Sequence, residues 1–304
     1  MGLTENQKRL IIAIAQKDMV SARKCAVACL GEDSTAKNKT FVKKYSTILT
    51  SAGENMIQLS QDLAKYVCVE EVSASFKEGR YFLSEREKRL FSDIVKMKKV
   101  SEKMSELGIS YINSSLLYGE SGTGKTTFGR YVAYKTGLPF CYLKFSNLVS
   151  SYMGNTSQNI SKAFSWAIEN PCVFMLDEID CISISRSGAS NSGADGEMGR
   201  ITISLMQEFD RLPNDVIVIG ATNRKDRIDE ALLRRFTIHH EVKRLSESER
   251  SEMVSKFFDD IHFLLTDAQL YGLINPEDTQ AGLMNRMISL LADHFMEESG
   301  ESES

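Results

Sequence analysis

The sequence lacks the features that mark membrane, secreted or zinc-dependent proteins. No apolar run approaches the roughly 18 residues that a membrane helix needs, so we predict no membrane association. None of the six cysteines forms a CxxC pair, and no Cys/His cluster has the spacing of a zinc site. Scattered cysteines suit a reducing cytoplasm. The first residues carry charges before only a short apolar stretch, which does not fit a secretory signal.

A strong net charge is also missing. The 304 residues include 37 Lys and Arg against 41 Asp and Glu, a formal charge of -4, and the sequence pI is about 5.7. Nucleic-acid-binding domains usually carry a basic surface, so this balance argues against nucleic acid as a partner. The composition, 42% hydrophobic and 26% charged, is that of an ordinary globular protein.

The chain divides by pattern into several segments. Residues 1–78 contain no proline and no strand-like alternation that we recognise, and Thr4 with Gln7 forms a capping box. We therefore predict an entirely helical N-terminal domain that binds a substrate or a partner protein. Residues 70–83 are expected to connect this domain to the next one.

Between residues 79 and 244, short apolar runs alternate with amphipathic helical patterns. That alternation predicts an α/β core in which a parallel sheet lies between helices. Residues 245–296 predict a small helical lid, and the acidic, serine-rich residues 297–304 predict a disordered tail. The apolar runs that should form the strands are 116–118, 140–145, 173–176, 216–219 and 237–242.

The strongest motif is a phosphate-binding loop at 119–126, which matches G-x-x-x-x-G-K-[ST] without a mismatch. Glycines let the backbone N–H groups turn inward, and the N-terminus of the following helix adds partial positive charge. We predict that Lys125 binds the β- and γ-phosphates of ATP and that Thr126 binds Mg²⁺. The predicted nucleotide-binding residues are Gly119, Glu120, Ser121, Gly122, Thr123, Gly124, Lys125, Thr126 and Thr127.

Two further apolar runs end on polar side chains. Asp177 and Glu178 follow the run 173–176, at the end of a strand where ligands sit in open α/β sheets. We expect Asp177 to hold Mg²⁺ and Glu178 to act as the general base for the attacking water. Asn223 is expected to hold that water or to sense the γ-phosphate. Taken alone, the acids also fit a charged surface and Asn223 fits a turn.

Arg234 and Arg235 follow a short amphipathic turn. A guanidinium can place a permanently charged, bidentate fork on a γ-phosphate, and we list both arginines as candidate catalytic residues. Without further context, adjacent arginines are usually solvated surface charge.

Together these motifs resemble a classical AAA ATPase module. The phosphate loop, the Asp-Glu pair, the Gly-Ala-Thr-Asn-Arg segment and the Ala-Leu-Leu-Arg-Arg-Phe segment follow the family's order and spacing over about residues 80–295. The Arg-Arg-Phe form is similar to the branch that includes spastin and katanin. The resemblance implies an AAA+ P-loop NTPase core with a five-stranded parallel sheet, and a ring, usually a hexamer. In that ring, Arg234 and Arg235 would act on the ATP of the next subunit.

The resemblance also gives a role to Tyr152, Met153 and Gly154. Family members that thread polypeptide carry an aromatic–hydrophobic–Gly loop here, which faces the central pore; otherwise Tyr152 is a core aromatic at a helix end. Residues 185–199, rich in Ser, Gly and Ala, match the second pore loop and should be mobile. The chain departs from the family at 155–157, where Asn-Thr-Ser replaces an acidic segment. Arg286 is a weaker candidate for a second sensor.

These expectations amount to a cytoplasmic ATPase that forms a homo-oligomeric ring and remodels, unfolds or threads a protein substrate. A separately encoded adaptor or protease is a candidate partner, and ATP with Mg²⁺ are the expected cofactors. The alternative is a nucleotide-switched assembly factor or nucleic-acid loader that does not thread polypeptide.

Overall fold

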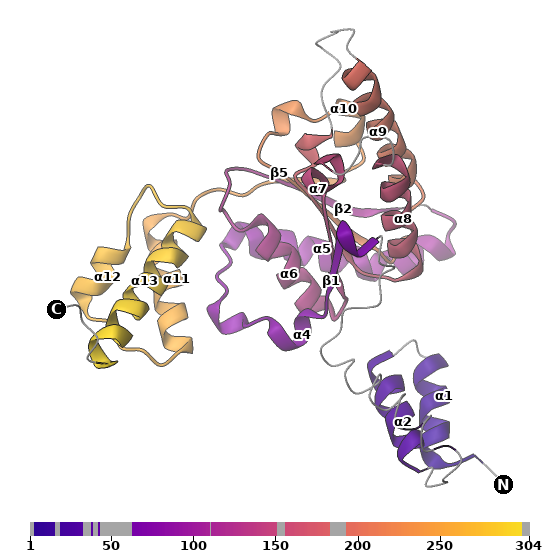
Figure 1. The fold of residues 1–304 in the computed structure, drawn as a ribbon, viewed down its shortest axis with the longest axis horizontal. Coiled ribbons are helices and arrows are strands. Elements are labelled where there is room, and N and C mark those ends of the chain that lie inside the picture. The colour runs from indigo at the N-terminus through magenta and orange to yellow at the C-terminus, as the bar shows by residue number, and fades with distance from the viewer. Residues whose placement is uncertain are drawn as a thin grey trace. The chain divides into compact units, whose positions relative to one another are not determined.

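A computed structural model describes residues 3–15, 19–32, 38, 42, 63–109, 111–150, 156–182 and 193–299 (Figure 1). The chain divides into two units, Met1–Gln58 and Leu59–Ser304. In the first unit, α1 (Glu5–Ala15) packs against α2 (Met19–Gly31). The predicted capping box is present, because the backbone N–H of Thr4 donates to Gln7 and that of Gln7 donates to the Thr4 hydroxyl.

The second unit is built on a six-stranded sheet with the order β1-β3-β4-β5-β2-β6. Strands β2 to β6 are mutually parallel and arise from the apolar runs that we expected to form strands, which confirms the predicted parallel core. Strand β1 lies at one edge and is antiparallel to β3. The strands are β1 (Val67–Glu70), β2 (Asn113–Tyr118), β3 (Phe140–Lys144), β4 (Val173–Asp177), β5 (Ile217–Thr222) and β6 (Ile238–Glu241).

Strand β1 corrects our prediction that residues 1–78 are entirely helical. Val67 and Val69 are buried, and the alternation of burial along the strand is typical of a sheet edge. A run of four residues is too short for its periodicity to distinguish a strand from a helix in the sequence. The segment forms a strand because it pairs with β3. The segment before it holds η2 (Leu63–Lys65), and the expected connector holds α4 (Val72–Ser75) and η3 (Glu78–Arg80).

Helices cover both faces of the sheet. Met175 on β4 lies close to Gly129 of α6 (Lys125–Thr136), whereas its neighbour Phe174 packs edge-to-face against Phe164 of α8 (Thr156–Glu169) with ring centroids 5.0 Å apart. Successive strand residues point to opposite faces, so α6 and α8 cover opposite sides. The other elements are α5 (Glu85–Glu106), α7 (Phe145–Ser150), η5 (Ile179–Cys181), α9 (Gly193–Phe209), η6 (Lys225–Arg227) and α10 (Glu230–Leu233).

Three helices occupy the segment that we predicted as a lid: α11 (Glu247–Asp260), α12 (Asp267–Leu273) and α13 (Gln280–Ser299). They share a core of their own, in which Val254, Phe258, Leu283 and Met287 are almost completely buried. Within the described residues, no helix is long and apolar enough to cross a membrane.

Two predicted loop segments are shorter than expected. Helix α9 begins at Gly193, so residues 193–199 are helical rather than part of the loop 185–199. Helix α13 continues to Ser299, so residues 297–299 are not a disordered tail. In both cases the helix extends into residues whose composition alone suggested a loop. Residues 185–192 and 300–304, and the candidate pore residues Tyr152, Met153 and Gly154, lie outside the described residues.

Candidate functional site

The phosphate loop connects β2 to α6, as the motif predicts, and its backbone has a positive φ at three glycines, of which Gly124 has a φ of 90°. Gly119 has a φ of 147° and Gly122 a φ of 79°, both outside the usual range of other residues. A Cβ at Gly119 would lie 2.2 Å from the carbonyl oxygen of Val242. A Cβ at Gly122 would lie 2.8 Å from the hydroxyl oxygen of Thr279. The loop therefore curls tightly between β6 and the lid.

Lys125 is buried at the start of α6. Its ammonium donates to the backbone carbonyls of Gly119 at 2.9 Å and Glu120 at 2.7 Å. Burial lowers the pKa of Lys125, and the nearby carboxylates of Asp177, Asp180 and Glu120 only partly oppose this shift. A bound phosphate would provide a stronger, charge-assisted acceptor than either carbonyl.

Asp177 ends strand β4 beside the first turn of α6. Its Oδ2 accepts hydrogen bonds from the Thr126 hydroxyl at 2.9 Å and from the Tyr142 hydroxyl at 3.1 Å. Burial and the Asp177 charge raise the pKa of Tyr142, so its phenol remains a donor. Tyr142 was not predicted from the sequence, because nothing local shows that β3 places it next to Asp177.

Thr126 and Asp177 together form a donor set that fits Mg²⁺. A hydroxyl and a carboxylate are hard oxygen ligands, and Mg²⁺ usually takes only one or two carboxylates and completes its shell with phosphate oxygens and water. In the part of the chain that the structure describes, no group of three or more His, Cys, Asp or Glu residues could hold a metal. A Mg²⁺ ion held by these two side chains would keep coordination positions for phosphate oxygens and water.

Glu178 follows Asp177 in the left-handed backbone region, with φ 55° and ψ 41°. This conformation is rare for a residue other than glycine and is often found at functional sites. The Glu178 carboxylate pairs with the Lys144 ammonium at 2.9 Å. Burial raises the pKa of Glu178, but hydrogen bonds from Ser146 and Lys144 outweigh this effect and lower it. The carboxylate is therefore ionised at neutral pH and is held by a cation on the neighbouring strand.

Asn223 is exposed just beyond β5 and lines the same pocket as Asp177 and Glu178. The Thr222 hydroxyl before it donates to Asp180 at 2.7 Å and accepts from the backbone N–H of Arg224 at 2.9 Å. These bonds fix the turn that carries Asn223 at the carboxyl edge of the sheet.

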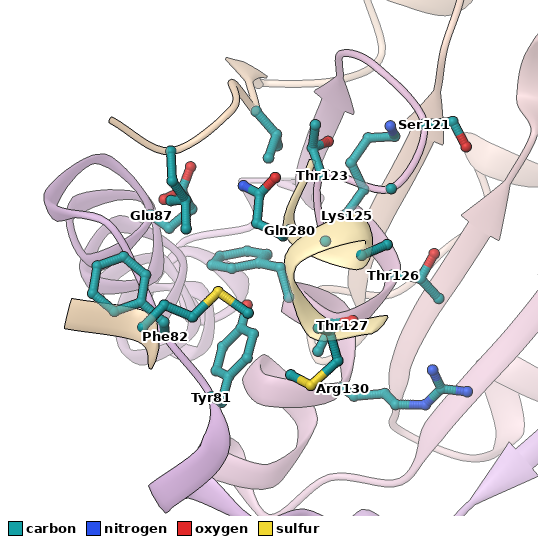
Figure 2. Close-up of a pocket in the computed structure, with 18 of the residues that line it drawn as sticks. Tyr81, Phe82, Glu87, Ser121, Thr123, Lys125, Thr126, Thr127, Arg130 and Gln280 are labelled. Carbon is teal, nitrogen blue, oxygen red and sulfur yellow. The ribbon is translucent and has the colours of Figure 1, made fainter. Parts of the chain in front are cut away.

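Most of the predicted nucleotide-site residues line a cavity of about 670 Å³ (Figure 2): Ser121, Gly122, Thr123, Gly124, Lys125, Thr126, Thr127, Asp177, Glu178 and Asn223. Gly119 and Glu120, which we also predicted, are not among the lining residues. Figure 2 shows side chains of the phosphate loop, of residues 81–87 and of the lid around one pocket. Away from the loop, its wall is largely aromatic and aliphatic, which suits the nucleoside part of a nucleotide. The sequence does not predict this wall, whose apolar members include Phe76, Tyr81, Phe82, Val242, Leu245, Met253 and Met284.

The lid contacts the phosphate loop directly. The backbone N–H of Ala281 donates to the carbonyl of Gly122 at 2.9 Å, and the Gln280 side chain donates to the carbonyl of Lys243 at 3.1 Å. Arg286 lies one turn further along α13, where it pairs with Asp278 at 2.5 Å and does not line the nucleotide cavity. The structure therefore gives no support to Arg286 as a sensor.

The structure does not bring Arg234 and Arg235 to this pocket. The Arg234 side chain is 72% exposed and pairs with Glu230 at 2.6 Å. Arg235 binds Asp210 through two hydrogen bonds of 2.9 and 2.8 Å and also donates to the carbonyl of Ala231. Neither guanidinium lines the cavity of its own chain.

Comparisons with known proteins agree with this geometry. Residues 115–244 match the family described as ATPase family associated with various cellular activities (AAA). The chain is 27% identical over 244 residues to the AAA family ATPase y4kL of Sinorhizobium fredii. The aligned segment covers 78% of this chain and 72% of that protein. It is 39% identical over 148 residues to the 26S proteasome regulatory subunit 8 homolog of Encephalitozoon cuniculi, covering 48% of this chain and 38% of that one.

A third relative is the peroxisomal ATPase PEX6 of Saccharomyces cerevisiae, 40% identical over 131 residues, or 42% of this chain and 12% of that protein. The chain thus matches less than half the length of the proteasome subunit and of PEX6. Among solved structures, the AAA domain of FIGL-1 in complex with ADP matches with a TM-score of 0.57 and 21% identity, over 75% of this chain and 78% of that one. This likeness supports the fold.

Proposed function

Residues 115–244 are an AAA ATPase domain, and on this premise we propose that the chain is a subunit of an ATP-driven ring that remodels, unfolds or threads a protein substrate. Members of this family bind and hydrolyse ATP. The observation that carries the proposal is the position of Arg234 and Arg235, which lie outside the pocket of their own chain. A neighbouring subunit that met this surface would receive the charges that its own pocket lacks.

The proposed reaction uses the groups around the cavity. Lys125 binds the β- and γ-phosphates, Thr126 and Asp177 hold Mg²⁺, and Glu178 takes a proton from the attacking water. Asn223 positions that water. For Glu178 to reach it, the carboxylate must leave the ammonium of Lys144.

If the nucleotide lies between neighbouring subunits of a ring, the ring should assemble only when nucleotide is bound. Glu178→Gln protein with ATP, whose hydrolysis is blocked, should elute in size-exclusion chromatography with light scattering at several times the 34.1 kDa of one chain. A hexamer is the expected species. Without nucleotide the mass should fall. A protein that stays at 34.1 kDa with ATP at every concentration would contradict the proposal.

Threading is proposed from the place of Tyr152, Met153 and Gly154 between α7 and α8. A tyrosine on a pore loop would pack between the side chains of an extended polypeptide without reading its sequence. Tyr152→Ala should retain ATP hydrolysis but lose ATP-dependent unfolding of a tagged fluorescent protein. Tyr271→Ala, at an exposed lid position, is the control. Unfolding that survives in Tyr152→Ala would favour the nucleotide-switched assembly factor instead.

The remaining parts of the proposal concern partners. The N-terminal helices would select the substrate or hold an adaptor or a separately encoded protease. All six cysteines are free, which suits the cytoplasm that we propose as the location. A pull-down with Glu178→Gln and ATP, compared with the same variant and ADP, would identify proteins held only in the ATP state.

A further inference from the structure

The phosphate loop carries an acidic side chain that is held by an arginine from another element. Glu120 is the second residue of the loop, and Arg244 lies three residues beyond the end of β6. The guanidinium donates through Nε to one carboxylate oxygen at 2.6 Å and through Nη2 to the other at 2.7 Å. A two-point pair of this kind fixes geometry as well as charge.

The same guanidinium also reaches the lid. Its Nη1 donates to the backbone carbonyl of Glu277 at 2.8 Å and to the Glu277 carboxylate at 3.2 Å. Glu277 lies three residues before α13, the helix whose N-terminal end contacts Gly122. Arg244 therefore links the phosphate loop and the lid through one side chain.

A carboxylate in this loop is a problem for a nucleotide site. Glu120 is close enough to Lys125 for each charge to act on the pKa of the other. ATP carries about four negative charges, of which Mg²⁺ would balance about two, and an unpaired Glu120 would repel the remaining charge near Lys125. The pairing with Arg244 removes that repulsion, since the loop then presents no net negative side chain.

We propose that Arg244 is a positioning residue that neutralises Glu120, so that the loop accepts a polyphosphate, and that it ties the lid to the loop in this state. The proposal rests on nucleotide binding at the phosphate loop and does not depend on threading. It predicts that the benefit of Arg244 grows with the charge of the nucleotide, from AMP through ADP to ATP. It should also shrink as salt rises, because the groups are partly exposed.

The test is a double-mutant cycle measured by equilibrium binding of a fluorescent ATP analogue and by competition with ADP and AMP. Arg244→Gln should weaken ATP binding about tenfold, and AMP binding by about twofold or less. Glu120→Gln should change ATP binding by no more than about threefold. The double variant Glu120→Gln/Arg244→Gln should return to within about threefold of wild type, because no charge is then left unpaired.

Arg9→Gln is a control, since Arg9 forms an exposed ion pair with Glu5 in α1 and is not among the residues that line the pocket. It should bind ATP like wild type. Raising NaCl from about 0.05 M to about 0.5 M should reduce the Arg244→Gln defect. Arg244→Gln and the double variant both lack Arg244, so a loss of stability caused by removing this arginine would affect both. Recovery of ATP binding in the double variant therefore cannot be explained by stability.

The outcomes separate this inference from the assignment of the site. If wild-type protein binds no nucleotide, the phosphate-loop site itself is wrong. If wild type binds ATP and Arg244→Gln binds equally well, only the role of Arg244 is overturned. A double variant as weak as Arg244→Gln would also overturn it, because the arginine would then act through packing and not by neutralising Glu120.

Discussion

Lys125 of the phosphate loop and the pair Arg234–Arg235 are all cationic side chains, but their surroundings differ. Lys125 is buried at the bottom of the pocket, and its ammonium is held by carbonyls of the same loop. Arg234 extends into solvent, and Arg235 is bound to Asp210, away from the pocket. The first region is complete within one chain, whereas the second has no phosphate to act on there. The comparison teaches that the two regions do not meet within one chain, and in the proposed ring they would belong to two different sites.

Removing both arginines is expected to have the largest effect, and it tests whether Arg234 and Arg235 take part in hydrolysis at all. Arg234→Ala/Arg235→Ala should lower kcat by about 10³ to 10⁵, the contribution of an arginine that stabilises charge in phosphoryl transfer. Phosphate release at saturating ATP measures the loss. Glu230→Gln and Asp210→Asn break the same ion pairs but keep both guanidinium groups, so they should retain most activity. A double variant with the wild-type rate would show that the arginines are surface charges.

On the pocket side, Glu178→Gln should lower kcat by about 10² to 10⁴, because the amide cannot accept the proton of the attacking water. ATP binding should be retained, since Glu178 pairs with Lys144 and not with the loop. Phosphate release and equilibrium ATP binding give the two readouts. Glu241→Gln, an exposed acid on β6, is the control. Equal losses of binding and rate would point to misfolding of the site instead.

Asn223→Ala should have a smaller effect, a fall in kcat of about tenfold, because a general base and the cations remain in place. KM for ATP should change little. Steady-state kinetics measure both parameters, and Asn170→Ala, directly after α8, serves as the comparison. A large rise in KM with an unchanged kcat would mean that Asn223 binds the ground state instead of positioning water.

The smallest effect should come from Lys144→Met, and it should be an increase of about two- to fivefold in basal kcat. Lys144 holds Glu178 and is one of the groups that lower its pKa. Without it the Glu178 pKa rises, so the carboxylate is more basic and becomes protonated at a higher pH. In a plot of kcat against pH, the fall in kcat on the acidic side should therefore occur at a higher pH than in the wild type. A lower kcat without this shift would contradict this account.

Much of the fold follows from local sequence. The parallel strands β2 to β6 are apolar runs that end on polar residues, and the loop motif specifies both its glycines and the helix that follows. The edge strand β1 was missed because its four residues make sense only when paired with β3. Burial on both faces explains why the central strands are easy to recognise and the edge strand is not.

The parts of the site that sequence did not predict depend on distant residues. Arg244 and Glu120 are 124 positions apart, and nothing near either residue identifies the partner. The aromatic wall at Phe76, Tyr81 and Phe82 belongs to residues 70–83, which the sequence predicts only as a connector because no motif marks them. Lys144 meets Glu178 only because β3 and β4 are neighbours. Such contacts are set by topology, which a single sequence pattern does not specify.

The most direct test of a site shared between subunits is ATP hydrolysis by mixed proteins. Glu178→Gln subunits keep both arginines, and Arg234→Ala/Arg235→Ala subunits keep the pocket with its base. Each protein alone should be inactive. Mixing them should restore part of the wild-type turnover, with the highest activity near equal amounts, because one subunit then supplies the arginines to the pocket of the other. No recovery at any ratio would contradict the account.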